Sequence, residues 1–195
     1  MKKKLTLLFA LVVMIVIGAN AQVELKGLIG MNLTSFQGSD YDNKAKVGYQ
    51  FGGGLLIGNK FYVEPTIQFV RNSTLLEESQ VDNLDESEFS QNLVKIPVHF
   101  GYHLLGSEDE SFALRVFAGP SISIPGKIKS GPEGITKDDV NSSIWAVDGG
   151  VGFDFLFLFV EASYEHSFND YFSEDVAVGG KHGGLILNAG VHLDF

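Results

Sequence analysis

The sequence contains no cysteine, so no disulfide can form and stability must come from sheet closure and packing. Basic residues are few, because 14 Lys and Arg stand against 24 Asp and Glu and the formal net charge is −10. A nucleic-acid-binding protein needs a basic face, so that class is excluded. Beyond its N-terminal segment the chain also lacks any run of about 18 apolar residues, which excludes a helical membrane protein.

The N-terminal segment has the three parts of a secretory signal peptide. Three lysines at 2–4 precede an apolar core at 5–17, and Ala19-Asn20-Ala21 forms a small-x-small cleavage site before Gln22. The apolar core is shorter than the roughly 20 residues that a spanning helix needs, which argues against a retained membrane anchor. We therefore predict a cleaved signal peptide at 1–21, export of the protein, and one further domain at 22–195.

The rest of the chain alternates apolar and polar residues with period two. In the last stretch, Leu185, Leu187, Ala189, Val191, Leu193 and Phe195 share one parity, and the other parity is mostly small or polar. Such alternation predicts a strand with one apolar and one polar face. The same pattern recurs over eight segments, at 23–36, 47–58, 61–72, 92–103, 112–124, 144–155, 157–168 and 183–195.

The lengths and spacing of these segments predict an all-β fold. About ten residues suffice for a tilted strand to cross a bilayer, and the spacers between the segments alternate long and short. Membrane barrels show this alternation because their periplasmic turns are short and their external loops long. We therefore expect an eight-stranded antiparallel up-and-down transmembrane β-barrel, with both termini at the periplasmic end. Aromatic residues near both ends of the segments, Phe61 and Tyr62 among them, are expected to form interfacial girdles.

Three prolines fall inside the predicted strands, at Pro65, Pro97 and Pro120. A closed barrel has no free edge at which a missing N–H donor could face solvent. Each proline is therefore expected to cause a bulge or a lost ladder bond.

Several short motifs resemble the PorT-like outer-membrane β-barrel family. The resemblance rests on Leu93-Val94-Lys95-Ile96-Pro97-Val98, Glu64-Pro65, Ala118-Gly119-Pro120, Asp148-Gly149-Gly150-Val151-Gly152, and Tyr164 followed by Phe168-Asn169. It extends over the whole chain after the signal peptide and implies a small eight-stranded barrel, similar to other porin-family barrels, in the outer membrane of a Gram-negative cell. The family has no general catalytic motif, so the resemblance implies no enzyme.

Charged residues occupy the inward parity of the predicted barrel. The main candidates for a lumen cluster are Glu64, Lys95, Arg115, Asp148, Glu161 and Glu165, and the same parity holds Glu24, Lys26, Asp154 and Asp194. Side chains just fill an eight-stranded barrel, and buried charges must pair. We expect Lys95 and Arg115, on adjacent strands, to meet acids from the third, sixth or seventh segment. A plug of salt bridges is favoured over a narrow proton or ion path on grounds of width.

Catalysis and metal binding are not expected at these residues. Along one strand Glu161 and Glu165 stand about 13 Å apart, which is too far for a catalytic carboxylate pair. His99 and His103 are separated in the same way, and no Ser lies in a nucleophile motif. We predict neither an enzyme nor a cofactor nor a metal site.

The segment between the third and fourth predicted strands is acidic and carries no basic residue. Its acids are Glu77, Glu78, Asp82, Asp85, Glu86 and Glu88. The spacing lacks the pattern of a defined calcium loop, so a solvated, self-repelling external loop is expected. We hypothesise that divalent ions bridge this loop near anionic lipopolysaccharide.

Together these patterns predict an outer-membrane protein with a structural or surface-binding role, carried by long external loops. The alternatives are a small pore or transport protein and a soluble lipocalin-like barrel that binds an apolar ligand. Expected partners are outer-membrane lipid, the barrel-assembly machinery, which would read Phe195 as a terminal signal, and an envelope or extracellular protein that the sequence does not identify.

Overall fold

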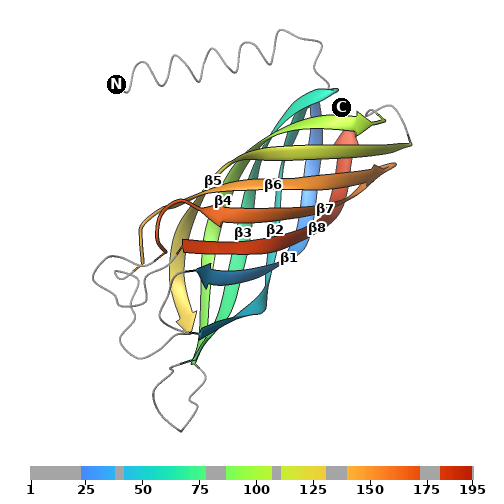
Figure 1. The fold of residues 1–195 in the computed structure, drawn as a ribbon. Helices are drawn as coiled ribbons and strands as arrows, with labels where there is room; N and C mark the ends of the chain where they lie inside the picture. The colour runs from blue at the N-terminus through green and yellow to red at the C-terminus, as the bar shows by residue number, and fades with distance from the viewer. Residues whose placement is uncertain are drawn as a thin grey trace, which may run out of the picture.

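A computed structural model describes residues 23–37, 42–77, 87–106, 111–130, 140–171 and 181–194. They form the strands β1 (Val23–Gln37), β2 (Asp42–Gly58), β3 (Phe61–Glu77), β4 (Ser87–Leu105), β5 (Phe112–Ser130), β6 (Ile144–Phe155), β7 (Leu158–Ser167) and β8 (Lys181–Asp194). The strands close into one barrel in chain order (Figure 1). The predicted eight-stranded antiparallel up-and-down barrel is therefore confirmed.

The predicted signal peptide at 1–21 lies outside the described residues. Within the described part of the chain, no helix is long and apolar enough to span a membrane.

The closing strand pairs with the first strand over its full length. The register runs from Glu24 opposite Asp194 to Gln37 opposite Lys181. The apolar parity of β8 faces outward, since Leu187 is 49% exposed, whereas Asn188 on the other parity is buried. The alternation read from the sequence therefore selects which face of β8 lines the lumen.

The barrel is apolar outside and polar inside. Alternating burial in β6 and β7 puts residues such as Val151 and Val160 on the outer surface and Asp148 and Glu161 in the interior. A hydrocarbon surrounding stabilises this arrangement because the apolar wall contacts lipid and every strand is paired with both of its neighbours. A lipocalin-like barrel would need the reverse arrangement.

The aromatic residues predicted to form an interfacial girdle include one that points outward and one that does not. Phe61, at the start of β3, is 77% exposed and lies where an interfacial girdle is expected. The expectation for Tyr62 is wrong, because this side chain is buried on the inward parity. Its place near a strand end predicted its depth, but parity determined its direction.

Four strands are longer than the sequence predicted. β2 begins at Asp42, β3 continues to Glu77, β4 begins at Ser87 and β5 continues to Ser130, which makes a taller wall on one side of the barrel (Figure 1). The added segments pair with one another, for example Asp42 with Glu77. Because they are largely polar, period-two alternation of hydrophobicity does not extend into them.

The longer strands correct the predicted connections. The first connection shrinks to 38–41, so long and short spacers do not alternate strictly. Glu77 and Glu88 belong to β3 and β4 rather than to a loop. The connections at 78–86, 131–143 and 168–180 remain long, and the strand ends that they join lie at the end of the barrel opposite the short turns. By the usual rule for membrane barrels, this is the external end.

A two-residue turn at the periplasmic end joins β2 and β3, where the sequence predicted a hairpin. Gly58 has φ of 133°, a conformation that L side chains rarely adopt. A Cβ there would also lie 2.2 Å from the carbonyl oxygen of Phe61. The Gly58-Asn59-Lys60 hairpin is thus confirmed, and glycine is required at its first position.

The prolines interrupt the ladder without shifting its register. The β3–β4 pairs stop at Pro65 opposite Val98 and resume in the same register at Gln68 opposite Lys95. The β4–β5 pairs likewise skip two positions after Pro97. Pro65 and Pro97 therefore cause lost ladder pairs rather than bulges. The register shifts occur at other positions, for example between Lys46 and Tyr49 of β2.

Candidate functional site

The charged side chains inside the barrel form two groups. The inner group consists of Lys26, Tyr62, Glu64, Arg115, Asp154 and Glu161. The outer group, nearer the external end, consists of Lys95, His99, Ser121, Asp148, Glu165 and His182.

Arg115 is the centre of the inner group. Its Nη2 lies 2.7 Å from Glu161 Oε1, its Nη1 lies 3.2 Å from Glu64 Oε2, and its Nε lies 2.8 Å from Asp154 Oδ2. Arg115 is 1% exposed, so all three contacts are shielded from solvent. The planar guanidinium suits such a site because it presents several donors in a fixed fork.

Lys26 closes the inner group into a ring of alternating charge. Its Nζ lies 2.8 Å from Glu64 Oε1 and 2.7 Å from Glu161 Oε1, so the two cations share both glutamates. β1, β3, β5 and β7 supply the four side chains, and no two of these strands are neighbours. The ring therefore ties the barrel together across its lumen.

Aromatic rings surround the shared cations. Lys26 Nζ lies 4.1 Å from the ring centroid of Phe159, and Arg115 Nη1 donates a 3.2 Å hydrogen bond to the hydroxyl of Tyr62. Gly152 leaves space for the guanidinium, since a Cβ there would stand 2.9 Å from Arg115 Nε. Ring faces attract cations electrostatically, and in a desolvated site this attraction is strongest.

Lys95 bridges the two acids of the outer group. Its Nζ lies 2.9 Å from Asp148 Oδ2 and also contacts Glu165. Ser121 Oγ lies 3.3 Å from Asp148 Oδ1 and 3.2 Å from Glu165 Oε2, so its one hydroxyl proton is shared between the two carboxylates. His182 Nε2 lies 3.0 Å from Glu165, so each acid has several partners.

Tyr171, from the segment after β7, links this group to the outer end of the lumen. The side chain is fully buried, packs edge-on against His182 and donates a hydrogen bond to Gln91. Burial raises the pKa of the Tyr171 phenol, so the group remains a donor at neutral pH. Sequence reasoning missed this residue, because a non-periodic segment gives no signal for an inward side chain.

Little free space accompanies the outer group. A cavity of about 10 Å³ is bordered by Gln50, Lys95 and Glu165, among other residues. A water molecule needs roughly 10–15 Å³, so this cavity holds at most about one. Gln50 Oε1, which is buried without a described hydrogen bond, would be a natural partner for such a water.

The structure distributes the six predicted lumen residues over both groups. Glu64, Arg115 and Glu161 lie in the inner group, and Lys95, Asp148 and Glu165 lie in the outer group. As expected, the acids come from β3, β6 and β7: Arg115 meets Glu64, Asp154 and Glu161, and Lys95 meets Asp148 and Glu165. Among the described contacts the two cations share no acid, because their positions along the barrel differ. Lys26 and Asp154, which the inward parity had marked, complete the inner group.

The other predicted residues lie largely beyond the described part of the chain. Glu78, Asp82, Asp85, Glu86 and Phe195 are outside it, and for Glu77 and Glu88 only the backbone is described. Their roles in the acidic loop and in assembly stay predictions. Among the described residues, no group of three His, Asp or Glu side chains is arranged to hold a metal ion.

Comparison with known proteins identifies a matching family and barrels of similar structure. A family model described as "outer membrane protein beta-barrel domain" matches residues 19–173. The outer membrane protein OprG of Pseudomonas aeruginosa has a similar structure, with a TM-score of 0.54 and 11% identity over 90% of this chain and 95% of that one. Neisserial surface protein A has a TM-score of 0.51 and 14% identity over 90% and 99% of the two chains. At these identities the likeness shows the fold alone, and no curated protein matches the sequence.

Proposed function

Because the chain belongs to the family of the outer membrane protein beta-barrel domain, we propose that this outer-membrane protein is a closed barrel with a structural or surface-binding role. External loops would carry that role. The two groups of ion pairs inside the lumen support the proposal, and they do so through the energy needed to separate them.

A pore would require a continuous path of water past Arg115 and Lys95. Arg115 alone would have to leave three buried carboxylates. Separating a buried ion pair costs on the order of 3–5 kcal/mol unless water replaces the lost partners. The ion pairs across the lumen therefore favour a role at the surface of the barrel over conduction through it.

We expect no reproducible single-channel steps when the purified barrel is inserted into planar bilayers, because the ion pairs block the lumen. A general-diffusion porin in the same membranes is the positive control, and a heat-shifted band on mild SDS gels confirms that the inserted protein is folded. Reproducible steps whose size changes in Glu165→Gln would assign conduction to the lumen and establish the pore alternative instead. Glu165→Gln is suited to this purpose because it preserves shape and removes one lumen charge.

The acidic segment supports a test of the surface role. In vesicles containing lipopolysaccharide, we expect proteases to cut within 78–86 more slowly with Mg²⁺ than with a chelator, because divalent ions would bridge the acids to lipid phosphates. A variant with amides at Glu78, Asp82, Asp85 and Glu86 should be equally sensitive in both conditions. Equal sensitivity of the unmodified protein would argue against the bridge.

A narrower family placement is also part of the proposal. We propose that the chain belongs to the PorT-like barrels, and the motif glycines give this a physical basis. A Cβ at Gly119 would lie 2.0 Å from the carbonyl oxygen of Val98, and one at Gly150 would lie 2.4 Å from that of Ala162. Close approach of neighbouring strands therefore explains why glycine stands at both motif positions.

We further propose two partners and a non-enzymatic role. The barrel-assembly machinery would recognise Phe195, and a protein at the cell surface would contact the loops. A non-enzymatic role is expected because Asp148, Glu161 and Glu165 are engaged by cations rather than available as an acid and a base.

A further inference from the structure

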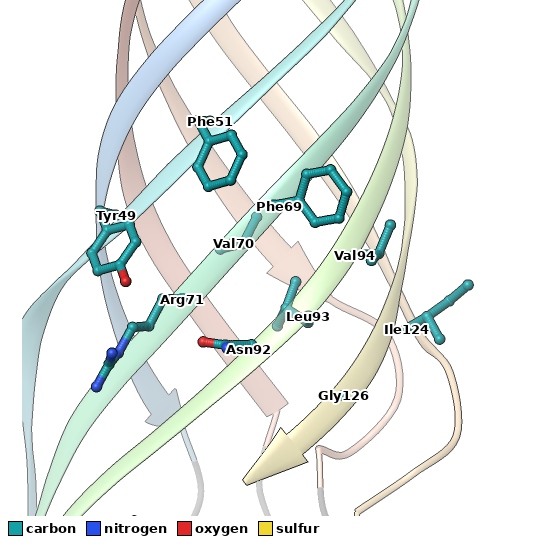
Figure 2. Close-up of a pocket in the computed structure, with 10 residues that line it drawn as sticks. All are labelled: Tyr49, Phe51, Phe69, Val70, Arg71, Asn92, Leu93, Val94, Ile124 and Gly126. Atoms are coloured by element: carbon teal, nitrogen blue, oxygen red, sulfur yellow. The ribbon is translucent and has the colours of Figure 1, made fainter. Parts of the chain in front are cut away.

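A groove of about 270 Å³ lies on the outer wall of the barrel, across β2, β3, β4 and β5 (Figure 2). Its apolar part consists of Phe51, Phe69, Val94 and Ile124. These four are direct neighbours across the sheet, since Phe51 pairs with Phe69, Phe69 with Val94 and Val94 with Ile124. The rings of Phe51 and Phe69 stack with centroids 5.5 Å apart.

A polar row borders this apolar row on the external side. Tyr49, Arg71 and Asn92 are again direct partners across β2, β3 and β4. Figure 2 shows Tyr49 and Arg71 nearer to the external ends of the strands than Phe51 and Phe69. Two residues along a strand correspond to about 7 Å, so the apolar and the polar rows are adjacent.

Arg71 interrupts the apolar outer face of β3. The preceding residues of the same parity are Phe61, Val63, Pro65, Ile67 and Phe69. Along β3, the outward parity therefore changes from apolar to cationic in one step, which is the change expected where acyl chains give way to headgroups. A cation at that level can lay its stem along apolar surface while its charge meets the polar layer.

The guanidinium of Arg71 is held in place at the rim of the groove. It stands 5.9 Å from the ring centroid of Tyr49, and its Nε donates a 2.9 Å hydrogen bond to Ser90 Oγ. This described hydrogen bond uses Nε and leaves Nη1 and Nη2 for another acceptor. A phosphate fits such a planar fork with two parallel hydrogen bonds.

We propose that this groove binds one phosphorylated lipid of the outer leaflet. An acyl chain would lie along Phe51, Phe69, Val94 and Ile124, and a phosphate would bind Arg71. The formal net charge of −10 gives no general attraction for an anionic lipid, so the local cation selects the headgroup. A second copy of the chain fits less well, because a two-fold contact through this surface would bring the two Arg71 side chains together.

The apolar row and Arg71 lie on the outer face, away from the ion pairs of the lumen, although Val70 and Leu93 line both the groove and the small lumen cavity. This inference therefore does not depend on the proposed function. A conducting barrel could still bind the lipid, and a closed barrel could lack the site. The conductance experiment and the lipid-binding experiment can therefore contradict one hypothesis without affecting the other.

Native mass spectrometry of the folded protein in dodecyl maltoside micelles tests the site. The probes are bisphosphorylated lipid A and its dephosphorylated form with the same acyl chains. We expect the phosphorylated lipid to be retained about tenfold better, the usual effect of a charge-assisted hydrogen bond. Arg71→Gln should lower its retention to the level of the dephosphorylated lipid, whereas Phe69→Ser should weaken the retention of both lipids.

Lys60→Gln is the matched control. Lys60 also lies near an aromatic ring, 5.6 Å from the centroid of Tyr102, but in the short turn at the opposite end of the barrel. Its substitution should leave lipid retention unchanged. If Arg71→Gln does not give a heat-shifted folded band, the comparison of the two lipids on the unmodified protein still decides the question.

Three results would overturn the proposal. One is a lack of phosphate selectivity at Arg71, seen either as equal retention of the two lipids by the unmodified protein or as unchanged retention by folded Arg71→Gln. Another is displacement of lipid A by inorganic phosphate at equal concentration, which would make Arg71 a site for the free ion. The third is a protein dimer, rather than a lipid adduct, that disappears in Phe69→Ser.

Discussion

Replacing Arg115 by methionine is expected to destabilise the barrel by about 3–5 kcal/mol, the usual cost of removing one partner from a buried ion pair. Glu64, Asp154 and Glu161 would remain buried with Lys26 as their one remaining cation in the inner group. Methionine fills much of the volume but supplies no donor. The measurement is the urea midpoint of unfolding in lipid vesicles, with the heat-dependent gel shift as a second readout.

A second substitution separates lost charge from lost packing. If unpaired carboxylates cause the damage, Glu161→Gln in the Arg115→Met background should recover part of the stability, although by itself it removes a well-paired acid. Lys60→Met, which removes a cation in the exposed turn between β2 and β3, should change the midpoint little. An Arg115→Met barrel as stable as the unmodified one would show that the inner group does not hold the barrel together.

Placing arginine at Val151 is expected to cost about 2–4 kcal/mol. Val151 is central in β6, 52% exposed, and its outward side chain faces the hydrocarbon. A charge there must desolvate or draw water and headgroups into the bilayer. Urea unfolding in phosphatidylcholine vesicles measures the loss.

Leu156 offers a control of similar exposure at a different depth. It lies in the turn between β6 and β7 and is 55% exposed. Arginine near the interface costs only about 0–1 kcal/mol, so Leu156→Arg should be nearly neutral. Equal losses at Val151 and Leu156 would mean that the wall around Val151 does not face lipid.

Several elements were predictable because their causes are local. The boundaries of β6 match the predicted 144–155, since both ends coincide with the ends of apolar alternation. The hairpin at Gly58-Asn59-Lys60 followed from turn chemistry. By contrast, the added ends of β2 to β5 are largely polar, so the alternation of hydrophobicity that predicts a strand is absent from them.

The lumen residues show even more clearly what the sequence can predict and what it cannot. Parity correctly predicted that Lys26, Glu64, Arg115 and Glu161 point inward. It could not predict their pairing, because each contact in this ring skips over an intervening strand. Such contacts depend on strand tilt and stagger, which no single strand specifies.

The sequence by itself therefore determined the fold class, the membrane-facing and lumen-facing parities, and the presence of charge inside the barrel. The physical reason is that side chains alternate along any strand with a fixed period of two. Tertiary structure alone decided the two separate ion-pair groups, the burial of Tyr171, and the groove beside Arg71. Each of these depends on the register between strands, and closure of the whole barrel sets that register.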